Sequence, residues 1–240
     1  MQMVYRLDTH VHTSEVSGCG KVSGADGAHL HKAAGYDGIA ITDHYYEGFF
    51  RRKPGAGWDE QMADFLSGFR AAKRAGEAVG LDVFLGIELR FLAEGGEDYL
   101  VYGFDEAFLY AHSRLDRMDL AFFGQMAKDS GIVIFQAHPF RAGQRVAHLA
   151  HPGFLDGIEV FNGNPRQNSN NEIAHAFAAS NALLELSGSD FHEFEDLARG
   201  GVLLARRPLD EADLARAFVD GTVTALLPQE MRRHCRSFWG

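Results

Sequence analysis

Two pairs of ionisable side chains in this chain are each separated by a single residue. His10 and His12 form the first pair, and Asp190 and His192 form the second. In an extended segment, residues two apart point to the same side, so each pair can aim both side chains at one point. Imidazoles and carboxylates arranged in this way form part of the coordination sphere of a first-row transition metal. A lone His-x-His is more often incidental than metal-binding, so the rest of the chain has to support this interpretation.

Further acidic and basic side chains stand where short apolar runs end. They are Asp43, His44, Glu88, His138 and Glu159. Each has a plain alternative role, such as an ion-pair partner for Glu88 or a polar turn for Asp190 and His192. Burying so many charges together is costly without a compensating cation. The joint pattern therefore predicts a metal site, and its mixed nitrogen and oxygen donors favour Zn, Mn or Fe over Ca.

The apolar runs are short and rich in Val, Ile, Leu and Phe, which predicts buried β-strands. They are Met3–Leu7, Gly38–Ile41, Val83–Ile87, Tyr99–Tyr102, Ile132–Phe135, Gly157–Val160, Ala182–Leu186 and Gly201–Ala205. Because these runs are continuously apolar rather than alternating, they indicate a parallel sheet that is covered on both faces.

Segments with helical periodicity separate many of these strands. They are Asp59–Val79, Leu115–Lys128, Asn170–Ser180 and Leu209–Val219. Gly35, Gly80 and Gly131 each precede a predicted strand, where a left-handed glycine commonly ends a helix. The repeated β-α order predicts an α/β fold, either a barrel or an open sheet, and barrel strands open on one face and bring the site residues together. No linker or repeat interrupts residues 1–240, so we expect one domain.

Composition excludes several functional classes. The 240 residues are 46% hydrophobic and 23% charged, as in soluble globular proteins. A net charge of −10 argues against long nucleic acid, which needs clustered Lys and Arg, but leaves room for a small phosphorylated substrate. Cys19 and Cys235 suggest neither a disulfide framework nor a zinc ribbon. With no apolar stretch long enough for a membrane span and no signal peptide, we expect a cytoplasmic protein with no membrane partner.

Taken together, five segments resemble the PHP (polymerase and histidinol phosphatase) metal-dependent phosphoesterases. In chain order they are Asp8–His12, Thr42–His44, Gly86–Glu88, Ala137–Pro139 and Gly188–His192. Each segment is short, but their order and separations match the family over most of the chain. The resemblance implies a distorted (β/α)7 barrel with two or three divalent transition-metal ions, Zn, Mn or Fe, at the C-terminal ends of its strands.

The resemblance also implies a ligand set for each metal. The ligands of the first metal would be His10, His12, Glu88 and Asp190. The second metal would be held by His138 and by Glu88, which bridges the two ions. His44 and His192 would hold a third ion where it is present, and Asp43 would orient a ligand or a metal-bound water.

The sequence departs from the family pattern in two places. A histidine that often follows the bridging glutamate is missing from Glu97–Tyr102, where either Asp98 substitutes or the metal keeps an open position. The residue that completes the third metal site is also missing from its usual segment, Thr13–Cys19. Glu15 is our candidate ligand there, and Cys19 is the second choice.

For such a centre we expect in-line hydrolysis of a phosphate ester by a metal-bridging hydroxide. His192, another site histidine or a metal-bound water would protonate the leaving alkoxide. Arg141 is the best candidate for binding phosphate oxygens, because a guanidinium can hold two of them together. Lys21, Arg51 and Arg52 could contribute, or could be solvated loop charges.

We therefore predict a phosphatase acting on a small phosphorylated metabolite, for example one like histidinol phosphate or a nucleotide. The alternatives are a nucleotide or oligonucleotide phosphodiesterase with exonuclease-like activity, a metal-dependent hydrolase of C–N or C–O bonds, and a non-catalytic metal-binding scaffold. Loops Tyr45–Gly57 and Arg141–Pro152 are expected to set specificity. Glu159–Asn164 is either a contact for the leaving group or a polar turn.

Overall fold

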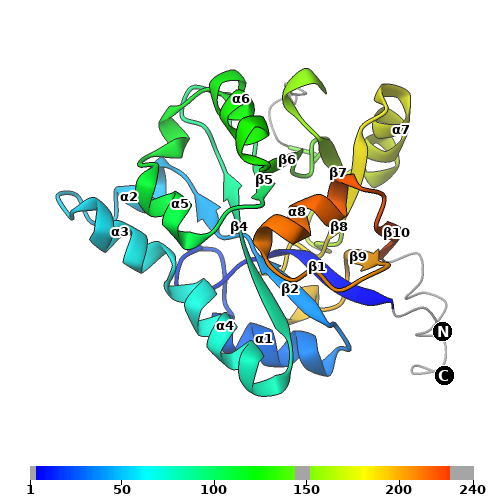
Figure 1. The fold of residues 1–240 in the computed structure, drawn as a ribbon, viewed down its shortest axis with the longest axis horizontal. Helices are drawn as coiled ribbons and strands as arrows, with labels where there is room; N and C mark the ends of the chain where they lie inside the picture. Colours follow the sequence, from blue (N-terminus) through cyan, green and yellow to red (C-terminus); the bar gives the residue numbers. More distant parts are fainter. Residues whose placement is uncertain (1–3, 144–151, 228–240) are drawn as a thin grey trace.

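The computed structural model describes residues 4–143 and 152–227. Within them the strands form one mixed sheet in the order β10-β9-β1-β2-β4-β5-β6-β7-β8, and the short β3 pairs with β4 (Figure 1). The strands are β1 (Tyr5–Val11), β2 (Gly38–Ile41), β3 (His44–Tyr45), β4 (Asp82–Leu89), β5 (Tyr99–Tyr102), β6 (Val133–Gln136), β7 (Gly157–Asn162), β8 (Leu184–Gly188), β9 (Gly201–Leu204) and β10 (Val223–Leu227).

The sheet curls into a nearly closed barrel because the end of β1 meets the chain that follows β8. The backbone N–H of His12 donates to the carbonyl of Phe191 at 2.9 Å, and the N–H of Phe191 donates to His10 at 3.0 Å. One step earlier, the Thr9 hydroxyl donates to the carbonyl of Ser187 at 2.7 Å. This closure agrees with the predicted PHP-type barrel, and it brings the C-terminal ends of β1 and β8 together.

The expectation of a parallel sheet is wrong for part of the barrel. β5 runs antiparallel to β4 and β6, and β9 runs antiparallel to β1 and β10. Both β5 and β9 are buried along their whole length, so they carry the same continuous apolar signal as a parallel strand. Because β5 is reversed, Asp98 at its N-terminal end lies beside the C-terminal ends of β4 and β6.

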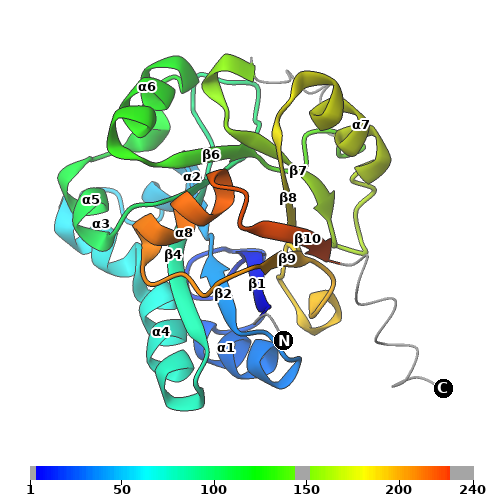
Figure 2. The same ribbon diagram turned by 45° about the vertical axis from the view of Figure 1, so that its right-hand side comes forward.

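Helices surround the barrel. They are α1 (Gly24–Ala33), α2 (Glu47–Phe50), α3 (Trp58–Phe65), α4 (Ser67–Val79), α5 (Glu106–Ala111), α6 (Leu120–Ser130), α7 (Asn171–Asn181) and α8 (Glu211–Val219). α1 and α4 pack side by side, and α8 lies across the barrel (Figure 2). Helix α8 contributes Leu214, Ala215 and Phe218 to the cluster of apolar side chains that fills the barrel.

Two predicted helices differ from the observed ones. The segment Asp59–Val79 forms two helices that meet at Leu66. In the segment Leu115–Lys128, the regular helix starts only at Leu120, because the side chain of Asp119 caps it by accepting the backbone N–H of Phe122. The left-handed glycines were correctly predicted, with φ of 86° at Gly35 and 71° at Gly80 and Gly131. The patterns in the sequence did not predict α1, α2, α5, β3 or β10.

Among the described residues, no helix is long and apolar enough to cross a lipid bilayer. Of the predicted specificity loop Arg141–Pro152, residues 144–151 lie outside the described ranges.

Candidate metal centre

The predicted ligands of the first metal converge at the end of the barrel where β1, β4 and β8 finish. His10, His12, Glu88 and Asp190 are each at most 2% exposed. The Nε2 atoms of His10 and His12 lie 3.0 Å apart. Both face a carboxylate oxygen of Glu88, at 3.6 and 3.3 Å, and Oδ1 of Asp190, at 3.5 and 3.4 Å. Four donors facing one point in this way are the arrangement that a bound metal requires.

A second group of donors shares Glu88 with the first. Nε2 of His138 lies 3.0 Å from Oε1 of Glu88, and a carboxylate oxygen of Asp98 lies close to both side chains. Asp98, which the sequence offers as a substitute for the missing family histidine, thus lies beside Glu88 and His138. Both of its oxygens also accept hydrogen bonds from Arg90 at 2.7 Å, so a metal bound there would compete with this guanidinium for the carboxylate.

A third group contains the imidazoles of His12, His44 and His192. Nδ1 of His44 lies 2.6 Å from Oε2 of Glu88. Cys19 lines the same cavity as His44 and His192. Burial raises the pKa of the Cys19 thiol, but hydrogen bonds with His192 and His44 outweigh it and lower that pKa to about 6.

The structure does not bring Glu15 to these ligands. Its two carboxylate oxygens accept the backbone N–H of Gly24 at 3.1 and 3.0 Å. Gly24 is the first residue of α1, and a carboxylate there satisfies a backbone N–H that has no partner within the helix. Glu15 also lines a separate cavity with Phe49 and Arg52. Cys19, the other candidate to complete the third metal site, lies beside the third group instead.

Hydrogen bonds behind the ligands orient two of the imidazoles. Ser17 donates its hydroxyl to Oδ1 of Asp43 at 2.6 Å and lies 3.2 Å from Nδ1 of His12. Glu159 lies 3.0 Å from Nδ1 of His10 and accepts the backbone N–H of His138 at 3.0 Å. These contacts leave the Nε2 atoms of both histidines turned toward the centre, as second-sphere partners do at metal sites.

Two residues of the centre adopt the left-handed backbone region that residues other than glycine rarely occupy. The φ angle is 53° at Asp190 and 30° at His138. Such a conformation costs about 1–3 kcal/mol and persists only where the surrounding structure holds it. Its occurrence at two predicted ligands is typical of a functional site.

Neighbouring charges shift the pKa of His10 and of Glu88 against the effect of burial. Burial lowers the pKa of His10, but the carboxylates of Glu159, Asp190 and Glu88 raise it well above its ordinary value. Burial likewise raises the pKa of Glu88, whereas His44 and His10 lower it well below the usual range. For His12, burial and the neighbouring His192 and His44 together lower the pKa.

Two buried side-chain atoms of the candidate ligands make no hydrogen bond. They are Oε2 of Glu88 and Nδ1 of His138. Nδ1 of His44 lies 2.6 Å from Oε2 as an ion-pair partner. A buried carboxylate oxygen without a hydrogen bond is costly unless a cation faces it. The donor set of imidazoles and carboxylates therefore fits divalent transition metals.

A cavity of about 320 Å³ opens over the centre. Its lining includes the cationic side chains Lys21, Arg90, Arg141 and Arg166. Nη2 of Arg141 donates to Oδ2 of Asp190 at 2.5 Å, so the predicted phosphate-binding guanidinium already lies against a metal ligand.

The other predicted cations do not line this cavity. Arg52 donates to the carbonyl of Val16 at 2.6 Å, and Arg51 pairs with Glu47 on the surface.

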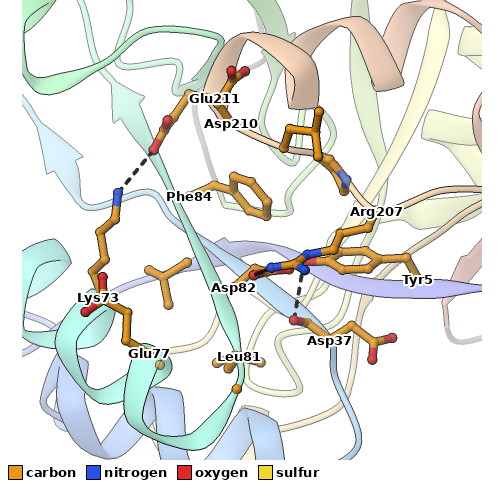
Figure 3. Close-up of a pocket in the computed structure, with 15 residues that line it drawn as sticks. Tyr5, Asp37, Lys73, Glu77, Leu81, Asp82, Phe84, Arg207, Asp210 and Glu211 are labelled. Carbon is orange, nitrogen blue, oxygen red and sulfur yellow. Dashed lines mark hydrogen bonds and ion pairs between the residues drawn. The ribbon is translucent and has the colours of Figure 1, made fainter.

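A larger cavity, of about 800 Å³, lies near the N-terminal ends of β1, β2 and β4 (Figure 3). Its lining residues, all within the described ranges, include no histidine or cysteine. Asp82 accepts hydrogen bonds from Tyr5 and from Arg207 there, each at 2.7 Å. Figure 3 shows Lys73 reaching toward Glu211 on the other side of this cavity. Contacts at the N-terminal end of a barrel serve stability, whereas active sites lie at the C-terminal end of the strands. Cavity size alone therefore does not mark the functional end.

No family model matches the sequence, and no curated protein matches it. Solved structures do match. PsfC from Pseudomonas syringae PB-5123 aligns with a TM-score of 0.62 and 19% identity, over 98% of this chain and 96% of that one. A metal-dependent phosphoesterase from Bifidobacterium adolescentis aligns with a TM-score of 0.54 and 18% identity, over 90% of this chain and 96% of that one.

A third match is a two-domain protein from Bacteroides vulgatus that contains a predicted PHP-like metal-dependent phosphoesterase. Its TM-score is 0.60 at 19% identity, and the alignment covers 92% of this chain. The present chain spans only 64% of that two-domain protein. These likenesses, at 18–19% identity, confirm the PHP-type barrel fold.

Proposed function

We propose that the protein is a metal-dependent phosphoesterase that hydrolyses the phosphate monoester of a small metabolite. The observation that carries the proposal is the convergence of buried His10, His12, Glu88, His138 and Asp190, with Oε2 of Glu88 left without a hydrogen bond. Structures of the same fold that are described as metal-dependent phosphoesterases support the reaction class.

The ligand sets proposed from the motifs fit this geometry. His10, His12, Glu88 and Asp190 would hold one metal, and Glu88 would bridge it to a second on His138 and Asp98. When bound, such a metal pair supplies Lewis acidity toward a phosphoryl group and a nucleophilic hydroxide. Glu159 and Ser17 would keep the imidazoles in the tautomers that coordination needs.

The side chains around the cavity would bind and orient the phosphate. A metal on Asp190 would compete with Arg141 for the carboxylate and free its guanidinium for two phosphate oxygens. His192 is 12% exposed, and its Nδ1 lies 2.9 Å from the carbonyl of Asp190. That contact leaves Nε2 as the atom that can give a proton to the leaving alkoxide.

The size and charge of the cavity support a small anionic substrate. At about 320 Å³ it lies at the lower end of the range for small-molecule sites. Four cationic side chains line it, whereas the chain as a whole carries a net charge of −10. This distribution favours one phosphorylated metabolite over a long polyanion.

The test is a phosphate-release screen over phosphorylated metabolites, with Mn²⁺, Zn²⁺ or Fe²⁺ added to the purified protein. We expect release from at least one monoester, and loss of both activity and bound metal in His10→Ala. The matched control is His175→Ala, because His175 is 60% exposed and pairs only with Glu185 on the surface.

Three outcomes would count against the proposal. An active, metal-replete His10→Ala protein would remove the proposed centre. Release from a phosphodiester substrate alone would favour the nuclease-like alternative. Release from no compound in the presence of bound metal would favour the scaffold alternative.

A further inference from the structure

The substrate cavity over the metal centre is lined almost wholly by polar and charged side chains. Within the described part of the chain, its lining includes no Val, Leu, Ile, Met or Ala and no Phe, Tyr or Trp. Cavities that bind small molecules are usually lined by apolar and aromatic side chains with a small number of polar groups. Tyr46 lines a smaller neighbouring cavity, where Arg90 lies over its ring. The substrate cavity therefore offers a leaving group hydrogen bonds rather than an apolar surface or a ring to stack on.

Three charged residues form an outer row in this cavity, in the order Lys21, Glu193 and Arg166. One oxygen of Glu193 pairs with Lys21, and the other lies 2.6 Å from Nη1 of Arg166. The three side chains are 70%, 16% and 39% exposed, whereas the predicted ligands of the first metal are at most 2% exposed. Because the cavity runs from those buried ligands to the exposed row, a phosphate bound at the metals would direct its leaving group toward the row.

A buried carboxylate holds the outer row in place. Asp196 is 0% exposed, and its two oxygens accept hydrogen bonds from Nη1 and Nη2 of Arg166 at 2.6 and 2.8 Å. Oδ2 of Asp196 also accepts the backbone N–H of His192 at 2.8 Å and that of Glu193 at 3.0 Å. The backbone N–H of Lys21 donates to the carbonyl of His192 at 2.7 Å. The row is thus fixed before a ligand binds, which lowers the cost of binding.

The alternating charges of the outer row suit hydroxyl groups. A hydroxyl can accept a hydrogen bond from Lys21 or Arg166 while it donates one to Glu193, whereas an ammonium group only donates and a carboxylate only accepts. With Asp196 included, the row holds two positive and two negative side chains, so it has no net charge to attract a second anionic group. Gln167 adds an exposed amide, which both donates and accepts, to the same lining.

We propose that the leaving group is polyhydroxylated, so that the preferred substrate is the phosphate monoester of a sugar or polyol rather than a nucleotide or an aryl phosphate. The inference rests on the proposed function, because it names the substrate class of that same site. A nucleobase is ordinarily held by stacking on aromatic side chains, and the described lining includes no Phe, Tyr or Trp. The phosphate would bind at the metals and Arg141, and the hydroxyl groups would bind along the outer row.

The first test compares kcat/KM among phosphate monoesters, with Mn²⁺ or Zn²⁺ added to the purified protein. The hydroxylated esters are glucose 6-phosphate, ribose 5-phosphate and glycerol 3-phosphate, and the comparison esters are AMP and phenyl phosphate. We expect at least one hydroxylated ester to exceed both comparison esters by at least about tenfold, because a site built to bond hydroxyl groups discriminates against a leaving group that leaves its polar side chains unpaired. Phenol is the better leaving group, so intrinsic reactivity would give the opposite order. An equal or higher kcat/KM for AMP or phenyl phosphate would overturn the proposal.

The second test removes one hydrogen-bonding group from the outer row. Lys21→Met keeps the length of an exposed side chain, so the fold should be retained. We expect KM for the best hydroxylated ester to rise about three- to tenfold with kcat nearly unchanged, whereas KM for phenyl phosphate should stay the same. Lys53→Met is the control, because Lys53 is 54% exposed, pairs with Asp64 and does not line this cavity.

Two results with Lys21→Met would contradict the proposal. An equal rise in KM for phenyl phosphate would mean that Lys21 binds the phosphate group rather than the leaving group. An unchanged KM for the hydroxylated ester would mean that the leaving group does not reach the outer row.

The experiments separate the substrate class from the proposed function. If the protein is not a phosphomonoesterase, it releases phosphate from none of these esters, and both inferences fail. If only the substrate class is wrong, it releases phosphate most efficiently from AMP or phenyl phosphate, and His10→Ala still abolishes that activity.

Discussion

At the scale of single residues, the side chain of Ser17 links Asp43 to His12, two residues that lie in different segments of the sequence. Its hydroxyl donates a hydrogen bond to Asp43, so its oxygen is left to accept a hydrogen bond from the Nδ1–H of His12. That fixes the imidazole in the tautomer with Nε2 free for a metal. Burial raises the pKa of Asp43 to about 6, although hydrogen bonds from Ser17 and Thr13 oppose the rise. Through Ser17, Asp43 is thus placed to orient His12, which is the role that the PHP resemblance implies.

Replacing Ser17 by Ala should weaken metal binding at His12. Without the hydroxyl, nothing holds the proton on Nδ1, and we expect the affinity of the first site to fall by about 10–100-fold. Competition with a chelator of known affinity measures this change. Ser14→Ala is the control, because Ser14 is an exposed serine on the same loop. Unchanged affinity in Ser17→Ala would show that Ser17 does not orient the ligand.

The sequence predicted the convergence of candidate ligands on or next to strands better than that of candidates on loops. His10 and His12 follow the two-residue period of a strand, so their common direction needs no knowledge of the fold. The choice between Glu15 and Cys19 depends instead on the path of a tight loop. Glu159 lies within a predicted strand, but its action on His10 depends on the register between β1 and its neighbours. No local pattern contains that information.

At the scale of elements, α1 and α4 are held close together by glycines. A Cβ at Gly24 would overlap the carbonyl oxygen of Gly68, and a Cβ at Gly68 would overlap the side chain of Thr13. Thr13 in turn donates to Asp43 through both its backbone N–H and its hydroxyl. The close contact of the two helices therefore supports the loop that carries Ser17 and Cys19.

Substitution of alanine at two glycines of α1 should change the stability of the protein in opposite directions. Gly24→Ala forces a methyl group against backbone atoms, which should destabilise the protein by about 1–3 kcal/mol. At Gly27 the added Cβ would meet only Phe191, at an ordinary 3.8 Å. There the loss of glycine flexibility should stabilise the fold by up to about 1 kcal/mol. Urea unfolding of the two variants measures both effects, and equal stabilities would contradict this account of the helix contact.

The direction of β5 is predictable from the length of the loop before it, although not from its apolar pattern. The apolar pattern of β5 could not reveal that it is antiparallel, because burial on both faces removes the alternation. Its connection to β4, Arg90–Asp98, is however shorter than the crossover of about a dozen residues that a parallel neighbour needs. Connection length thus identifies β5 as antiparallel, and with it the position of Asp98 at the metal centre.

At the scale of the whole molecule, the barrel has two chemically different ends. One end is filled by α8 and fastened by the contacts of Asp82 with Tyr5 and Arg207. The other end gathers buried histidines and carboxylates whose charges are satisfied mainly by one another. Because removing charges from water is costly, a bound cation should stabilise the folded protein more than its few contacts suggest.

The pH dependence of this stabilisation follows from the shifted groups. The pKa of His10 is raised in the folded, metal-free protein. Its contribution to stability is therefore fully present below the unfolded pKa of about 6.5 and is lost as pH rises through the folded value. Glu88 and Asp190 have lowered pKa values, so their contributions are present above about pH 4 and are lost only on further acidification. Metal binding requires a deprotonated His10, so the metal is favoured as pH rises.

The difference in unfolding free energy between metal-loaded and metal-free protein should therefore widen as the pH rises through neutrality. The difference widens at a fixed metal concentration because Kd falls as the pH rises. Where the free metal concentration is 100 times Kd, the stabilisation should be about 2.7 kcal/mol. Thermal unfolding with Zn²⁺ or with a chelator, repeated across pH, measures the difference, and His10→Ala provides a protein in which it should be much smaller. A difference that stays constant or narrows with rising pH would mean that His10 is not deprotonated on metal binding. The buried carboxylates would then be balanced by protons rather than by a metal.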